Sequence, residues 1–214
     1  MTSEELELAG AQVRPCWLVT PLDGVGPLRF GMTVEEAAAA LPEARELRRF
    51  QADPRSSEIV GLELGWESAQ PALYEYFRGS GQLFCIAADA VRGPLMSLDG
   101  ALLTGSDPAE LEQWLSDVSE SMGVGLRFGP RGNPGIEELG LVLRVQGAAD
   151  GVLTRPVLVG REWFERCVDD YESLIPECEW AGRLWPYERD PERQEIWPSA
   201  GELPPWYGSW SPPF

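Results

Sequence analysis

The sequence is rich in carboxylates and poor in the other side chains that enzymes use for catalysis. Its 214 residues include 35 acidic residues and 17 arginines but no lysine or histidine, and the net charge is −18. The lack of histidine excludes Ser-His-Asp and Cys-His nucleophile pairs and every histidine-ligated metal site. The lack of lysine excludes Schiff-base chemistry and the P-loop lysine. This composition favours a binding protein over an enzyme, so we assign no catalytic residue, metal ligand or cofactor.

Acid–base catalysis by a pair of carboxylates is the chemistry that stays open. Glu63, Glu67 and Glu75 lie on or beside expected strands and could face one groove, as a carboxylate-dependent hydrolase requires. The simpler interpretation places them on the polar side of alternating strands. The glycine-rich stretch 129–135 lacks both G-x-G-x-x-G and the Walker lysine, so we expect a hairpin loop there and not a phosphate cradle.

Two acidic ridges are candidates for contact with a protein partner. One lies in the stretch 162–179, where seven acids accompany a single internal arginine, and the other follows the outer side of the helix expected after residue 107. Such surfaces attract basic partners, although each acid taken singly also fits a solvated helix face. The same charge argues against direct nucleic-acid binding, which needs a basic face. The candidate partner-binding residues of the two ridges are Asp169, Asp170, Glu172, Glu112, Asp117 and Glu120.

The C-terminal segment 180–214 differs in composition from the rest of the chain. It holds five of the nine tryptophans and seven prolines, and it ends in PPWYGSWSPPF. Proline at this density excludes a regular helix. Two interpretations stay open: the segment packs on the domain and completes its core, or Trp206, Tyr207 and Trp210 stay exposed and anchor a protein partner.

The cysteines and the first residues bear on the compartment. Cys16, Cys85, Cys167 and Cys178 are spaced too widely for a C-x-x-C motif, so we expect reduced, mostly buried thiols, with a Cys167–Cys178 bridge as the alternative. The acidic start MTSEELELAG does not resemble a secretory signal, and no apolar stretch approaches the roughly 20 residues of a membrane span. These observations favour a cytoplasmic protein without membrane contact.

Two capped helices and several strands are expected to position these residues. Thr33 and Glu36 have the spacing of a capping box and begin an Ala-rich helix, after which Glu43–Phe50 could add a helical turn or two. Asp107, followed by proline, begins a second helix with an apolar stripe at helical spacing. A third helix is expected at about 161–174, and strands at 14–20, 59–64, 72–77, 82–88, 95–103, 124–128, 141–146 and 152–159.

The two helix starts align with a constant offset of 74 residues. Thr33 falls on Asp107 and Glu36 falls on Glu110, and both helix starts precede strand-rich sequence. This predicts two helix-then-sheet units at about 25–98 and 99–175, although any two capped helices look alike over ten residues. We expect an α+β domain over 14–179, with antiparallel sheet and helices packed on one face. An acidic end (1–13) precedes this domain and the segment 180–214 follows it.

The string GPLRFGMTVEEAAAAL resembles a helix start of the superfamily that contains the β-lactamase inhibitory protein and SmpA/OmlA-like outer-membrane assembly lipoproteins. The resemblance covers about 16 residues and centres on Gly31-Met32-Thr33. In that superfamily the motif opens a short helical pair that packs on a four-stranded antiparallel sheet, and the inhibitory protein has two such units in tandem. The resemblance implies a fold that presents a sheet surface to protein partners, and it carries over no binding residue.

These observations lead to one expected function and two alternatives. We expect a non-enzymatic immunity or inhibitor protein that neutralises a basic toxin or enzyme made by the same or a competing bacterium. Its acidic surface would steer the partner, and its aromatic residues would anchor it. The alternatives are a structural or regulatory subunit that docks through its C-terminal segment, and a carboxylate-dependent hydrolase.

Overall fold

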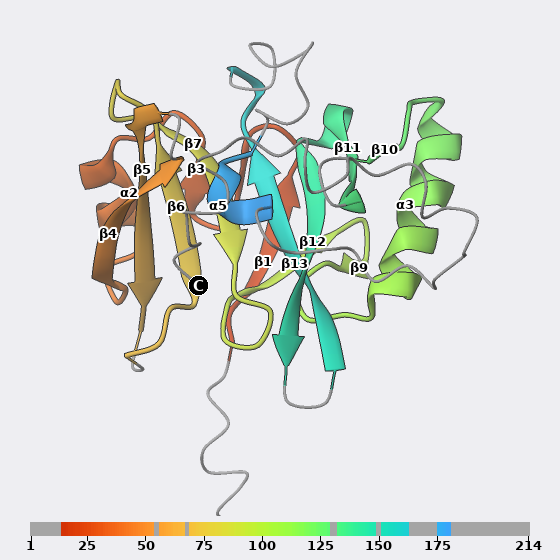
Figure 1. The fold of residues 1–214 in the computed structure, drawn as a ribbon, viewed down its shortest axis with the longest axis horizontal. Helices are drawn as coiled ribbons and strands as arrows, with labels where there is room; N and C mark the ends of the chain where they lie inside the picture. Colours follow the sequence, from red (N-terminus) through yellow and green to blue (C-terminus); the bar gives the residue numbers. More distant parts are fainter. Residues whose placement is uncertain are drawn as a thin grey trace, which may run out of the picture.

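The computed structural model describes residues 14–53, 56–66, 69–128, 132–148, 151–162 and 175–180. Within these ranges the strands form two sheets of eight and five strands (Figure 1). Every pair of neighbours in the larger sheet is antiparallel, and the smaller sheet has one parallel pair. The expected α+β class is confirmed, with more strand than helix.

The larger sheet consists of two sets of four strands, and each set follows a helix. The first set follows α2 (Val34–Ala40) and contains β4 (Arg45–Asp53), β5 (Ser56–Gly65), β6 (Leu73–Phe77) and β7 (Leu83–Ala88). The second follows α3 (Pro108–Met122) and contains β10 (Arg127–Phe128), β11 (Pro134–Ile136), β12 (Leu141–Ala148) and β13 (Gly151–Val159), with a 3₁₀ turn, η2 (Glu137–Leu139), before β12. The sheet order is β10-β11-β12-β13-β7-β6-β5-β4, so the last strands of the two sets pair with each other.

The smaller sheet has the order β3-β2-β1-β8-β9. Its strands are β1 (Cys16–Thr20), β2 (Gly24–Val25), β3 (Leu28–Arg29), β8 (Leu95–Leu98) and β9 (Ala101–Leu102). The β8–β9 hairpin turns at Asp99-Gly100, as the sequence predicts, and both residues have positive φ (48° and 84°). Positive φ at two successive turn residues matches the twist of the flanking strands.

Both helix starts are capped by the side chains that the sequence singles out. Thr33 Oγ1 accepts a hydrogen bond from the Glu36 amide at 3.2 Å, and the Glu36 carboxylate accepts one from the Thr33 amide at 2.9 Å, which completes the capping box. The Asp107 carboxylate accepts from the Ala109 amide at 2.8 Å. Gly123 ends α3 in the left-handed conformation, with φ of 66°.

The extra helical turn considered for Glu43–Phe50 is wrong, because this stretch belongs to β4. Arginine and glutamate favour helices locally, but antiparallel pairing with β5 overrides that preference. The pairing brings the Phe50 ring over Gly61, where a Cβ would lie only 2.4 Å from the ring. The loops expected at 51–57 and 129–135 are also shorter than predicted, since β4, β5 and β11 extend into them.

The two faces of the larger sheet carry separate cores. On the first face, residues such as Leu62, Ile86 and Leu143 pack with side chains of the smaller sheet, α2 and α3. On the second face, Tyr74, Tyr76, Phe84, Cys85, Val142 and Val157 pack with Ile175 and Cys178, the latter in the short helix α5 (Glu177–Trp180). In Figure 1, α5 lies in front of the larger sheet and β1 lies behind it.

Several expectations lie outside the described residues. These are the acidic end 1–13, nearly all of the third helix and nearly all of the segment 180–214. In the part of the chain that the structure does describe, no helix has both the length and the apolarity to cross a membrane.

Candidate functional site

Three of the nine expected partner-binding residues are described, and all three lie on α3. Asp117 and Glu120 are exposed, as expected, whereas Glu112 is half-buried. The N-cap Asp107 and Glu110 in the first turn are exposed as well, and no basic residue occurs anywhere from position 106 to 126. Every charged side chain on α3 is therefore acidic.

Exposed apolar side chains lie at the end of this acidic helix and just after it. Met122, in the last turn of α3, is 46% exposed, and Phe128, in the edge strand β10, is 51% exposed. Arg127 lies between them in sequence, but its guanidinium forms an ion pair with Glu137 at 3.1 Å. We define the α3 surface as Asp107, Glu110, Asp117, Glu120, Met122 and Phe128.

The other six expected residues lie outside the described part of the chain: Asp169, Asp170, Glu172, Trp206, Tyr207 and Trp210. The side chains of two members of the same acidic ridge are described, and they differ from each other. Glu162 is 66% exposed and forms an ion pair with Arg78 at 2.7 Å. Glu179 is fully buried and points into the second face of the larger sheet. The interpretation of the ridge as a solvated helix face is therefore wrong at Glu179.

The Glu179 carboxylate occupies the centre of a buried polar cluster that the sequence analysis missed. Arg144 on β12 and Arg155 on β13 are directly opposite each other in the sheet, and both are fully buried. Arg155 donates to Glu179 from Nη2 at 2.8 Å and from Nε at 3.2 Å, and Arg144 donates from Nη1. The Tyr76 hydroxyl on β6 donates a fourth hydrogen bond. One carboxylate thus joins three strands.

The electrostatics of this cluster favour the ionised carboxylate. Burial alone would raise the pKa of Glu179, but Arg155 and Arg144 outweigh burial and hold that pKa at about 2. Burial also acts to lower the pKa of Arg155, yet Glu179 raises it above its usual value. The Arg155 guanidinium stacks over the Tyr74 ring, with Cζ 4.1 Å from the ring centroid.

A pattern in the sequence does point to the two arginines. Each interrupts an apolar strand, LVLRVQ at 141–146 and VLTRPVLV at 152–159. Strand alternation places Arg144 on the same side as the buried Val142, which already indicates a buried cation. Nothing local identifies its partner, because Glu179 is 35 residues further along the chain.

The proposed groove with Glu63 and Glu75 is wrong, because the two side chains lie on opposite faces of the larger sheet. Glu63 is opposite Tyr74 and points to the second face, whereas Glu75 is opposite Leu62 and points to the first. Their placement on a solvated strand face is wrong as well, since both are buried. Arg48 Nε donates to Glu63 at 3.0 Å. Glu75 Oε1 is buried without a hydrogen-bond partner, and burial raises its pKa to about 7.

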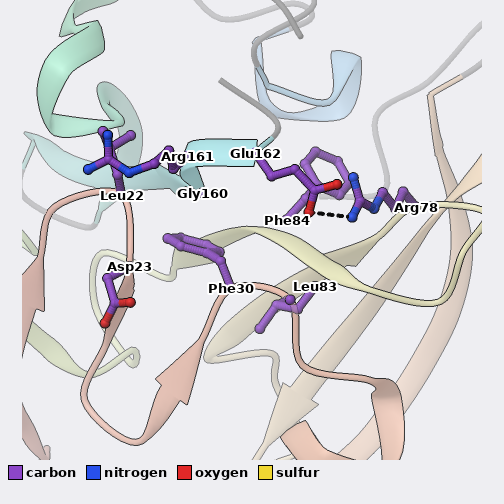
Figure 2. Close-up of a pocket in the computed structure, with 10 residues that line it drawn as sticks. Leu22, Asp23, Phe30, Arg78, Leu83, Phe84, Gly160, Arg161 and Glu162 are labelled. Atoms are coloured by element: carbon purple, nitrogen blue, oxygen red, sulfur yellow. Dashed lines mark hydrogen bonds and ion pairs between the residues drawn. The ribbon is translucent and has the colours of Figure 1, made fainter. Parts of the chain in front are cut away.

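A small surface pocket of about 270 Å³ lies where the β1–β2 turn, the β3–α2 connection, the β6–β7 hairpin and the chain after β13 meet. Figure 2 shows Phe30 in the middle, with the Arg78–Glu162 ion pair on one side and Asp23 on the other. Asp23 itself pairs with Arg29 at 3.3 Å. Because both lining carboxylates are held by arginines, this pocket gives no support to an acid–base pair.

The described cysteines are free thiols. Cys16 is exposed, whereas Cys85 and Cys178 are fully buried on the second face. Burial, with Glu179 close by, raises the pKa of both buried thiols, so they are protonated and inert as nucleophiles. Among the residues that the structure describes, no group of three acidic or cysteine side chains could hold a metal ion.

Comparison of the chain with known proteins found no relative. No protein-family model matches the chain, and no curated protein or solved structure matches it either.

Proposed function

We propose that this chain is a non-enzymatic, cytoplasmic protein-binding module of the immunity or inhibitor kind, and that it engages a basic protein through the α3 surface. The observation that carries the proposal is the uniform sign of that surface. Its four exposed acids have no basic neighbour from position 106 to 126, in a chain whose net charge is −18. A field of one sign speeds the approach of a partner of opposite charge.

The apolar residues of the α3 surface supply what charge alone cannot. Exposed acids are screened by salt and contribute little to the lifetime of a complex. Protein interfaces are instead stabilised by a few large apolar or aromatic side chains that become fully buried on binding. Met122 and Phe128 are about half exposed and lie beyond the acids at the C-terminal end of α3, so they are suited to this part.

The topology of the larger sheet supports the resemblance to the inhibitory-protein superfamily. A helix followed by four antiparallel strands occurs twice, and the two sets join into one sheet through β7 and β13. The Gly31-Met32-Thr33 motif starts the first of the two helices, and Thr33 is its cap. The proposal of a tandem fold that serves protein binding rests on this arrangement together with the motif.

The proposal is tested by affinity capture from a lysate of the native host, with the tagged full-length chain as bait. The first matched bait is Glu110→Gln/Asp117→Asn/Glu120→Gln, which removes three of the four acids of the α3 surface and keeps the N-cap Asp107. The second is Glu43→Gln/Glu58→Gln/Glu138→Gln, which removes as much charge from exposed sites outside α3. We expect one basic protein that binds the wild-type and control baits at low salt and is lost from the α3 variant. Equal capture by all three baits would contradict the proposal.

The alternative function makes a different prediction in the same experiment. A subunit that docks through its C-terminal segment would keep its partner when the α3 acids are neutralised. It would lose that partner when residues 200–214 are deleted. A partner that is lost when residues 200–214 are deleted, and that stays bound at high salt, would replace the immunity or inhibitor proposal with the assembly role.

A further inference from the structure

The buried arginines Arg144 and Arg155 require an anion beside them near the centre of the larger sheet. The two residues are cross-strand partners, and both side chains are buried on the second face. Like charges directly opposite each other destabilise a sheet, and a buried cation without an anion is costlier still. These strands are therefore built around a negatively charged group that they do not themselves provide.

The donors around Glu179 form the set that proteins use to recognise a carboxylate. Arg155 approaches with two nitrogens, at 2.8 and 3.2 Å, in the forked geometry of a guanidinium–carboxylate pair. Arg144 and the Tyr76 hydroxyl complete a ring of four donors. All four come from strands in the interior of the larger sheet, so ladders on both sides hold the backbone of each donor residue without α5.

The occupant, by contrast, belongs to a short element. The helix α5 has four residues, far fewer than the roughly 12–15 that an isolated helix needs for marginal stability. The segment Ile175–Trp180 is held on the sheet by Ile175, Cys178 and the carboxylate of Glu179. Its position therefore depends on the contacts that it makes with the sheet, whereas the sheet is held by its own ladders.

We propose that Tyr76, Arg144 and Arg155 form a carboxylate-binding site of which Glu179 is the internal occupant. An external carboxylate, from a small organic acid or from an acidic peptide, takes the same place when the segment Ile175–Trp180 moves aside. The site is on the second face of the sheet and is independent of the α3 surface, so each proposal can fail without the other.

The first test is chemical rescue of Glu179→Ala in the full-length chain. Acetate has the heavy atoms that this substitution removes. We expect the melting temperature to fall by roughly 10 °C in chloride. Sodium acetate should restore about half of that loss or more, with half-saturation on the order of 10 mM. Acetamide, the neutral analogue, should restore nothing.

The matched control is Glu63→Ala, which removes a buried carboxylate from another arginine pair on the same face. Its partner Arg48 is about half exposed to water, so no closed anion site is left behind. Acetate should stabilise Glu63→Ala no more than chloride does. An equal response of the two variants, or no response of Glu179→Ala, would overturn the proposal. If Glu179→Ala does not fold in chloride, recovery of the near-UV circular dichroism signal by acetate replaces the melting temperature, and no recovery overturns the proposal.

Two further arms identify the source of the carboxylate and test displacement. The acetylated, amidated peptide IPECEW, which repeats residues 175–180, and its version with glutamine at the second glutamate are titrated into Glu179→Ala. Binding of the glutamate peptide at least tenfold tighter than acetate indicates a protein source, and weaker binding indicates a small organic acid. In the wild-type chain, the favoured ligand should speed amide hydrogen exchange at Cys178 and Glu179. Unchanged exchange at saturating ligand would overturn the claim that Glu179 is displaced.

Discussion

Glu75 on the first face of the larger sheet and Glu179 on the second face are both buried, and their carboxyl groups are held in opposite ionisation states. Glu75, on the first face, is packed among apolar side chains, and one of its oxygens has no hydrogen-bond partner. Glu179, on the second face, accepts four hydrogen bonds, three of them from arginines. The pKa is about 7 for the first and about 2 for the second. Burial acts to raise the pKa of both carboxyl groups, and only at Glu179 do neighbouring arginines outweigh it, so these cations account for the difference.

The two faces therefore stabilise the molecule in different ways. The first face gains its stability from apolar packing and tolerates a carboxyl group at a cost. On the second face a charged cluster holds the segment Ile175–Trp180, because the Glu179 carboxylate accepts hydrogen bonds from all four donors there. Buried ion pairs give little net stability over an apolar core, but they are expensive to break.

The largest expected effect comes from removing Arg155, because this cation contributes most to the low pKa of Glu179. Arg155→Met leaves Glu179 buried with Arg144 as its only cation, and we expect the free energy of unfolding to fall by about 3–5 kcal/mol. Arg48→Met removes the half-exposed partner of the buried Glu63, and water can enter where the guanidinium stood, so we expect a smaller loss of about 1–2 kcal/mol. Urea unfolding at pH 7 measures both. Equal losses would mean that the buried cluster has no special part in stability.

The next effect is the acid sensitivity that Glu179 confers. Its pKa is about 2 in the folded state against an ordinary value of 4.5, so its contribution is present above pH 4.5 and is lost as the pH falls through 2. Glu179→Gln should be less stable than wild type by on the order of 3 kcal/mol at pH 7, and the deficit should shrink toward pH 2. The difference in stability between the two proteins is measured by urea unfolding at several pH values between 2 and 8. A difference that does not change with pH would contradict this account.

Glu75 should show the opposite slope, with a similar or smaller size. Its folded pKa of about 7 lies above the ordinary 4.5, so its contribution is fully present below pH 4.5 and is lost as the pH rises through 7. Glu75→Gln should leave stability unchanged at pH 4 and raise it by about 2–3 kcal/mol at pH 8. The same series of urea midpoints measures it. A variant less stable than wild type at pH 8 would show that the carboxylate has a partner in the folded state.

A smaller effect extends the comparison to an exposed carboxylate with a structural role. Asp107 accepts the Ala109 amide at 2.8 Å as the N-cap of α3. Asp107→Ala should cost about 1 kcal/mol, and Asp107→Asn should cost only a few tenths, since asparagine also caps helices. Thermal unfolding of the two variants separates the cap from the charge. Equal losses would assign the effect to charge alone.

Elements with strong local signals were predictable from the sequence. The cap at Thr33, the proline after Asp107 and the turn at Asp99-Gly100 each specify a backbone conformation within a few residues. The exposure of Asp117 and Glu120 followed from helical spacing alone, since the buried residues Leu111 and Leu115 fix the opposite side.

The features that escaped prediction depend on contacts outside the segment in which they lie. β4 has a helix-favouring composition, and only pairing with β5 makes it a strand. Glu63 and Glu75 were placed on one solvated face because alternation was read without knowing that both faces of the sheet are covered. The cluster at Arg144 and Arg155 needs a glutamate brought in from α5, which no local pattern specifies.

The central functional claim is that exposed acids on α3 steer a basic partner, and it is tested most directly by the salt dependence of affinity. The dissociation constant of the captured partner is measured at 50–300 mM salt for wild type, the α3 variant Glu110→Gln/Asp117→Asn/Glu120→Gln and the control Glu43→Gln/Glu58→Gln/Glu138→Gln. We expect the wild-type and control constants to rise together by about tenfold or more across the range. The α3 variant should bind about tenfold more weakly at low salt and respond less to salt. An α3 variant that matches the control at every salt concentration would contradict the account.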